Sequence, residues 1–221
     1  MTDIFREVDE ELRQERLASL WKRYGTYVVA AVILIVGAVG GYRLYNSWQA
    51  GQSGESGAKF IAALGLIEEE RFDEARPLLS ELAEDGHGAY PTLARFQEAA
   101  VLAADGKRDD AVALYDRIAV EGGVETAFRD LARLRAAILL VDTAAPDEIS
   151  RRVGDIAAGD GIWRHTAREA LALSRYRAGD YARADEILDE IMADPAAPAR
   201  LKSRAEIIRT LIAPKLGAEG G

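Results

Sequence analysis

The stretch RFQEAAVLAADGKRDDAVALYDRI, residues 95–118, decides the fold class because it encodes two helices joined by a short turn. Apolar side chains recur at helical spacing on both sides of that turn. They are Phe96, Ala99, Ala100 and Ala103 before it, and Ala111, Tyr115 and Ile118 after it. The turn, residues 106–109, combines a glycine with an aspartate that can cap the second helix. The stretch therefore predicts a helical hairpin.

Three further segments follow the same pattern when one residue of the second helix, here called position 0, is the reference. Position 0 is Ala75, Ala111, Ile149 and Ala184 in the four copies, which are 36, 38 and 35 residues apart. Positions +4 and +7 are apolar in every copy. They are Leu79 and Leu82, Tyr115 and Ile118, Val153 and Ile156, and Leu188 and Ile191. Four hairpins are therefore predicted between residues 58 and 213.

The first helix of each hairpin has its own apolar positions, at −15, −12, −11 and −8. Fifteen of these sixteen residues are apolar, although hydrophobic residues make up only 49% of the chain, and Glu169 is the exception. Position −12 is always alanine, which lets the second helix approach closely. With the alanines at position 0, these residues form a predicted repeat-core signature: Ala63, Ala75, Ala99, Ala111, Ala137, Ala172 and Ala184.

A single hairpin cannot bury both of its faces, so the hairpins are expected to stack into an α-solenoid. Aspartates at the start of the second helices are expected to accept hydrogen bonds from free N–H groups. They are Asp73, Asp109, Asp147 and Asp180. A last helix, about residues 199–212, would cap the open end, and residues 214–221 are predicted to be a disordered tail. The predicted fold class is therefore all-α.

A second segment, YGTYVVAAVILIVGAVGGY, residues 24–42, carries no charge. As a helix it would span roughly 28 Å, close to the thickness of the hydrocarbon core of a bilayer. It predicts a transmembrane signal-anchor helix over residues 24–45. Within it, Gly37 and Gly41 form a G-x-x-x-G, a weak signal for helix–helix contact in the membrane. A cleaved signal peptide is disfavoured, because the preceding arm is long and acidic and no convincing A-x-A site follows.

Basic residues predict how the anchor is oriented. Arg13, Arg16, Lys22 and Arg23 precede the apolar run, whereas only Arg43 follows it closely. The positive-inside rule places residues 1–23 in the cytoplasm and the repeats outside, which in a bacterium means the inner membrane and the periplasm. The segment NSWQAGQSGESG, residues 46–57, is predicted to be a flexible linker.

The cytoplasmic arm, residues 1–23, is predicted to be an amphipathic helix. Ile4, Phe5, Val8 and Leu12 form an apolar stripe. The stripe suits either docking on a partner or the membrane, or a solvated extension of the anchor.

The sequence offers little for catalysis. It has no cysteine and only two histidines, His87 and His165, and it matches no nucleophile, phosphate-binding or zinc motif. His165 lies four residues before Glu169, and a surface histidine beside a carboxylate is the simplest interpretation. The net charge is −9, of which −8 lies beyond residue 57, so nucleic acid is a poor partner. We expect no enzyme activity, no cofactor, no metal and no small-molecule substrate.

A row of basic residues recurs at position −16. It consists of Lys59, Arg95, Arg133 and Arg168. The row could line a surface that attracts acidic segments, or its long stems could cover the flanks of the repeats. The sequence does not assign the residues of a partner-binding groove.

The hairpins resemble tetratricopeptide repeats. Phe60 and Phe96 fit the first aromatic of that pattern, Tyr176 the second, and the alanines at position 0 the small residue of helix two. The spacing exceeds the usual length, and Ile149 departs from the pattern.

The whole layout resembles a more specific group. An arm ending in LWKRYG, an apolar anchor, then GYRLYNSWQ and degenerate repeats are similar to the YfgM-type ancillary subunits of the bacterial Sec (SecYEG) translocon. That resemblance implies an inner-membrane scaffold in protein secretion that links the Sec translocon to periplasmic chaperones. An envelope-stress or cell-division regulator, using the arm and the repeats to bind signalling partners, is the alternative.

Overall fold

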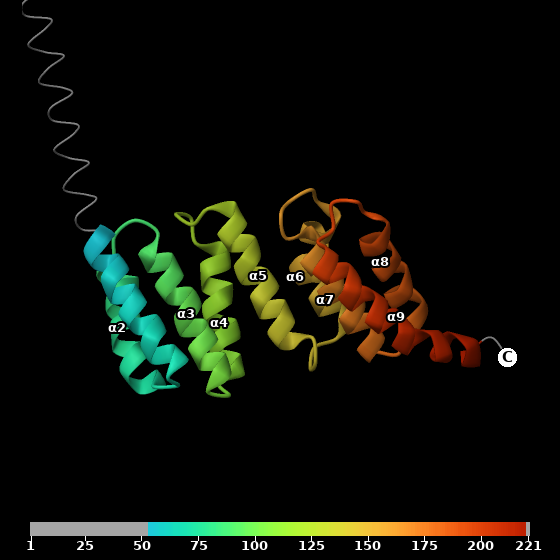
Figure 1. Cartoon of the computed structure of the whole chain (residues 1–221), viewed down its shortest axis with the longest axis horizontal. Helices are drawn as coiled ribbons and strands as arrows, with labels where there is room; N and C mark the ends of the chain where they lie inside the picture. The colour runs from blue at the N-terminus through green and yellow to red at the C-terminus, as the bar shows by residue number, and fades with distance from the viewer. Residues whose placement is uncertain (1–52, 220–221) are drawn as a thin grey trace, which may run out of the picture. The chain divides into compact units, whose positions relative to one another are not determined.

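The computed structural model describes residues 53–219, and within that range every regular element is a helix (Figure 1). The first helix covers residues 53–68. The helices that follow are α2 (Phe72–Asp85), α3 (Tyr90–Ala104), α4 (Arg108–Val120), α5 (Thr126–Leu140), α6 (Pro146–Ala158), α7 (Arg164–Arg177), α8 (Tyr181–Ala193) and α9 (Ala199–Glu219). The predicted all-α solenoid of hairpins is confirmed for this part of the chain.

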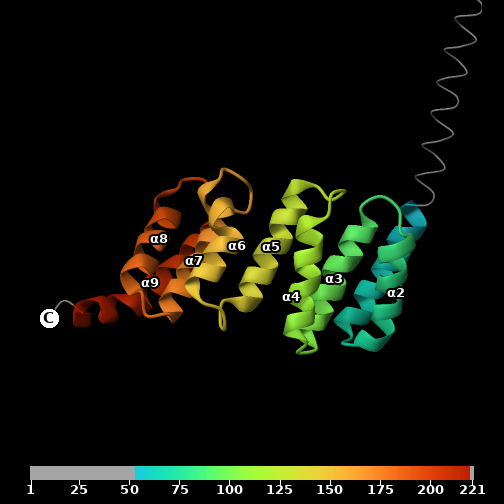
Figure 2. The ribbon, with the colours of Figure 1, turned by 180° about the vertical axis from the view of Figure 1, so that it is seen from behind.

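Each helix packs on the next one in the chain, and Figures 1 and 2 show them following one another from residue 53 to α9. Helix α5 also contacts α7, and α7 contacts α9, so the first helices of the third and fourth hairpins adjoin. The apolar core consists of four clusters. Each cluster combines one hairpin with the helix that follows it, and α9 fills that place for the last hairpin. It therefore closes the end of the stack, as predicted.

The predicted register is correct throughout the four hairpins. Every residue at positions 0, +4 and +7 is buried, and so are the four alanines at position −12. Because an alanine at position −12 presents only a methyl group, the two helices of each hairpin pack closely. The repeat-core signature therefore lies in the core of the solenoid.

The turns within the hairpins differ in their backbone. Gly106 and Gly179, both at position −5, adopt φ of +78° and +81°. The equivalent residue of the first hairpin is Glu70, which adopts φ of +59° without being glycine. The third turn instead places Pro146 at the first position of α6, where a missing N–H costs nothing.

Of the four predicted caps, only Asp180 caps its helix, through a hydrogen bond accepted from the Arg183 backbone N–H at 3.3 Å. The N-cap positions of α2, α4 and α6 are Arg71, Lys107 and Ala145, and none makes a side-chain cap. Asp73, Asp109 and Asp147 lie in the first turn instead. There their charge favours the positive end of the helix dipole, which explains why aspartate suits these positions.

Two predicted boundaries were wrong. Residues 53–57, assigned to the flexible linker, are helical, and both Ser56 and Gly57 are buried. The Ser56 hydroxyl accepts a hydrogen bond from the His87 backbone N–H at 3.1 Å. At the other end, α9 continues through Pro214 to Glu219, where a tail was expected, because Leu216 packs on the last core cluster. Tertiary contacts outweighed the polar composition at both ends.

Several predictions concern residues outside the described part. The cytoplasmic arm, the anchor at residues 24–45 with Gly37 and Gly41, and the linker up to residue 52 all lie there. Among residues 53–219, no helix is both long enough and apolar enough to cross a bilayer.

Candidate functional site

A pocket of about 750 Å³ opens between α5 and α7, the first helices of the third and fourth hairpins. Six positions, −18, −15, −14, −11, −8 and −7, contribute to its lining from both hairpins. They are Leu131, Leu134, Arg135, Ile138, Val141 and Asp142 in one hairpin, and Thr166, Glu169, Ala170, Leu173, Tyr176 and Arg177 in the next. Trp163 and Arg204 complete the lining. The repeat geometry itself therefore builds the pocket.

The pocket is apolar at its floor and partly apolar at its rim. Leu134, Val141 and Ala170 are buried, whereas Ile138 keeps 45% of its surface exposed. Leu173, at the same position −11 as Ile138, is half-buried. Pockets with an apolar lining and a few polar groups are typical binding sites. The sequence marked position −11 as apolar but could not separate it from the buried position −12.

Different contacts join α5 and α7 at the two ends of the pocket. At the start of the helices, the Trp163 indole Nε1–H donates to the Ala127 carbonyl at 2.8 Å. At their other end, the Arg177 guanidinium pairs with Asp142 at 2.6 Å. Both partners of this ion pair are largely exposed, whereas Trp163 is half-buried. Helices α5 and α7 therefore run parallel, joined at both ends with the pocket between them.

Glu169, the only polar residue among the predicted apolar positions, is buried and paired. Its two carboxylate oxygens accept hydrogen bonds from Nε and Nη2 of Arg204 on α9, at 2.6 and 2.5 Å. This two-point contact is the strong form of a charged hydrogen bond. It attaches α9 to the rim of the pocket. Ile207 and Leu211 follow Arg204 at helical spacing and are 62% and 54% exposed, so apolar surface continues along α9.

Among the described residues, most of the charged side chains that line the pocket are paired, but one is not. Arg177 and Arg204 neutralise the two lining carboxylates, Asp142 and Glu169. Arg135, at position −14 of the third hairpin, is exposed and makes no hydrogen bond or ion pair with any residue of the described range. One positive charge therefore remains at the rim of an apolar pocket, in a domain that is acidic as a whole.

The basic row at position −16 has a structural role. Lys59 pairs with Glu81 at 2.7 Å, Arg133 with Asp155 at 2.5 Å and Arg168 with Glu190 at 3.4 Å. In these three hairpins the carboxylate lies at position +6 of the second helix, and in the remaining one Arg95 pairs with Glu121. Each basic residue therefore bridges the two helices of its own hairpin, which disfavours the row as a docking surface for acidic segments.

A second recurring feature escaped the sequence interpretation. Position −21, at the start of the first helix, is aromatic in three hairpins: Tyr90, Phe128 and Trp163. Tyr90 lies against Phe60 of the preceding hairpin, with ring centroids 5.8 Å apart, and Phe128 lies against Phe96 at 6.2 Å. Trp163 packs on the core cluster that contains Leu134. An aromatic residue thus joins each hairpin to the previous one, and its spacing was visible in the sequence.

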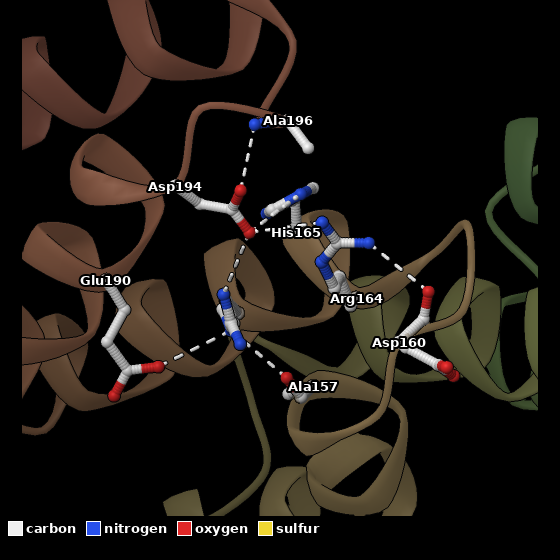
Figure 3. A network of polar contacts seen from close by, with 8 residues as sticks. Ala157, Asp160, Arg164, His165, Glu190, Asp194 and Ala196 are labelled. Atoms are coloured by element: carbon white, nitrogen blue, oxygen red, sulfur yellow. Dashed lines mark hydrogen bonds and ion pairs between the residues drawn. The ribbon is translucent and has the colours of Figure 1, made fainter.

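His165 lies in a polar network between α7 and the end of α8 (Figure 3). It is only 6% exposed, and neither ring nitrogen makes a hydrogen bond within the described part of the chain. Nε2 stands 3.5 Å from the Asp194 carboxylate, which also pairs with Arg164 at 3.1 Å and accepts a hydrogen bond from the Ala196 backbone N–H. Burial and the neighbouring Arg164 lower the pKa of His165, against the opposing effect of Asp194.

The prediction of a surface histidine was therefore wrong for His165. His165 lies on a buried face of α7 itself, and Glu169, its predicted neighbour, pairs with Arg204 instead. His87 is exposed, as a residue between two helices usually is. Within residues 53–219, no three side chains of the metal-binding types are placed to hold an ion.

Comparison with known proteins gives one finding about the family. Residues 19–159 match the family model described as a tetratricopeptide repeat-like domain. That range covers more than half of the chain, including the predicted anchor and the hairpins up to α6. No curated protein and no solved structure matches the chain.

Proposed function

We propose that this chain, which belongs to the tetratricopeptide repeat-like domain family, is a membrane-anchored protein-interaction scaffold. Domains of this type are typically non-catalytic and bind other proteins. The observation that carries the proposal is the pocket between α5 and α7, where Ile138 and Leu173 present apolar surface beside arginines. Exposed apolar surface of this kind marks interaction sites.

The finer proposal is that the chain is a YfgM-type accessory subunit of the Sec translocon in the bacterial inner membrane. The repeats would lie in the periplasm, next to periplasmic chaperones. This proposal is supported by the uncharged run at residues 24–42, by the basic residues that precede it, and by a family match that starts at residue 19. A tether keeps a binding surface at high concentration beside a membrane complex.

Topology is the first test of the finer proposal. A phosphatase reporter that is active only outside the cytoplasm should be active when fused after Gly57 and inactive when fused after Leu12. The opposite pattern would exclude a periplasmic function.

Affinity purification of the full chain from gently solubilised membranes tests the partners. We expect Sec translocon subunits and periplasmic chaperones among the recovered proteins. Ile138→Asp should lower their recovery severalfold, because the charge must be desolvated in the pocket. The matched control is Ile162→Asp, since Ile162 is 74% exposed and does not line the pocket. Equal losses in both variants would mean that the pocket is not the binding surface.

A regulator of envelope stress or cell division is the second candidate, favoured by the apolar stripe in the cytoplasmic arm. Deleting residues 1–20 separates the two functions. The scaffold should keep its translocon association without the arm, whereas a regulator should lose its signalling partner.

A further inference from the structure

The inference concerns the occupant of the α5–α7 pocket, and it rests on the proposed function. We infer that the pocket binds an apolar segment of a protein chain that carries an Asp or Glu side chain, and that Arg135 selects that carboxylate. Three observations lead to this occupant: the apolar lining, the charge at the rim, and the open continuation toward α9.

The lining sets the apolar part of the occupant. Leu131, Ile138 and Leu173 line the pocket, and the volume of about 750 Å³ has room for several side chains. A polar segment would leave its own groups without partners against this surface. The occupant must therefore supply apolar side chains.

The positive charge at the rim determines which polar group the occupant carries. An occupant that fills the pocket removes water from around Arg135, and covering an unpaired cation is costly. A carboxylate on the occupant offsets that cost and gains a charge-assisted hydrogen bond in a partly dry environment. Arg177 and Arg204 already have carboxylate partners, so Arg135 is the group that an incoming acidic side chain meets.

At position −14, only the third hairpin carries a charged side chain. The equivalents of Arg135 at position −14 are Ile61, Gln97 and Ala170, and none of them carries a charge. The remainder of the domain is acidic and repels acidic partners. At position −14, a carboxylate-bearing segment therefore meets a positive charge in the third hairpin alone among the four, which gives specificity.

The geometry favours a segment that passes through the pocket and does not end there. Arg204 at the rim is followed by the exposed Ile207 and Leu211, so apolar surface extends beyond the pocket along α9. A chain that ends in the pocket would leave this surface uncovered. The carboxylate is therefore assigned to a side chain and not to a free C-terminus.

The test uses the full chain in lipid nanodiscs, without free detergent that could enter the pocket. Two fluorescein-labelled twelve-residue peptides share one leucine- and alanine-rich sequence and differ only in carrying three glutamates or three lysines. Both are acetylated and amidated, so neither has a terminal carboxylate. We expect the glutamate peptide to bind about tenfold to a hundredfold more tightly in fluorescence polarisation, since one charged hydrogen bond separates them.

Charge reversal identifies the selecting residue. Arg135→Glu should abolish the preference for the glutamate peptide or invert it, and Arg135→Gln should reduce it. The control is Arg151→Glu, which makes the same change at an exposed arginine of α6 and should leave the preference unaltered. A third peptide, with neutral side chains and a free C-terminus, tests the other source of a carboxylate.

Three results would overturn the inference. They are equal dissociation constants for the glutamate and lysine peptides, a preference unchanged by Arg135→Glu, and tight binding of the free C-terminus peptide alone. If Ile138→Asp abolishes peptide binding while the parent chain binds the glutamate and lysine peptides equally, the pocket is still a binding surface for proteins. The scaffold function then stands, and only the acidic occupant is excluded. A failure of the scaffold function would be seen in a different experiment, the affinity purification from membranes, as equal losses of partners in Ile138→Asp and Ile162→Asp.

Discussion

Glu70 adopts a backbone conformation that its counterparts Gly106 and Gly179 adopt as glycines. A side chain in the left-handed region costs roughly 1–2 kcal/mol, because Cβ crowds the following carbonyl. Glycine removes that crowding but loses more entropy on folding. We expect Glu70→Gly to raise the unfolding free energy by about 0.5–1 kcal/mol in urea titrations. Gly106→Ala adds a side chain at the equivalent turn and should lower the unfolding free energy. If both variants changed the unfolding free energy in the same direction, the left-handed backbone would not be the cause.

Another prediction at this scale follows from His165. Its folded-state pKa lies below the unfolded value of about 6.5, so the unfolded chain binds the extra proton first. Stability should therefore fall as pH decreases from about 7 to 5. The groups that face the ring are Arg164 and Arg168 on α7, Asp194 after α8 and Lys202 on α9.

Urea unfolding at several pH values checks this dependence. His165→Gln should flatten the slope between pH 7 and pH 5, because it removes a group that binds its proton more tightly in the unfolded chain than in the folded one. His87→Gln serves as the control, since His87 is exposed, and it should keep the slope of the parent chain. Carboxylates such as Asp194 and Asp155, whose pKa values lie below their usual range beside arginines and N–H donors, titrate in more acidic solution.

At the scale of the helices, the core outweighs the ion pairs. Leu188, at position +4 of α8, is fully buried, and truncation to alanine should cost about 2–5 kcal/mol. Arg133 and Asp155 form a well-aligned pair, but Asp155 is mostly exposed, so Arg133→Ala should cost about 1 kcal/mol or less. Thermal unfolding of both variants compares the two effects. An unchanged melting temperature for Leu188→Ala would contradict the core assigned to α8.

The helices and their register could be predicted because each buried residue repeats at a fixed local spacing. The pocket could not, because positions −12 and −11 are both apolar and only the packing decides which one faces out. Glu169 looked like an exception in the sequence, since its partner Arg204 lies on a helix outside the repeat pattern. The aromatic residues at position −21 were predictable in principle, because Tyr90, Phe128 and Trp163 recur with the repeat. The burial of His165 depends on the distant Asp194 turn, which no local pattern encodes.

At the scale of the whole molecule, we predict that the anchor supplies association and the repeats supply recognition. A fragment of residues 53–221 starts where the described helix starts and keeps the buried Ser56 and Gly57. This fragment should still bind periplasmic chaperones weakly, but should not co-purify with the translocon, because it loses the high local concentration at the membrane. Co-purification undiminished in the fragment would show that the anchor contributes nothing to the association.

The contacts at the two ends of the α5–α7 pocket differ in how they respond to dissolved ions. The tryptophan hydrogen bond at one end is half-buried and insensitive to dissolved ions, whereas the Arg177–Asp142 pair at the other end is exposed and screened by them. Rising ionic strength should therefore weaken the Arg177–Asp142 contact and leave the tryptophan hydrogen bond unaltered. We predict that a segment held between α5 and α7 is released from the Arg177 end first as the salt content of the surrounding compartment rises.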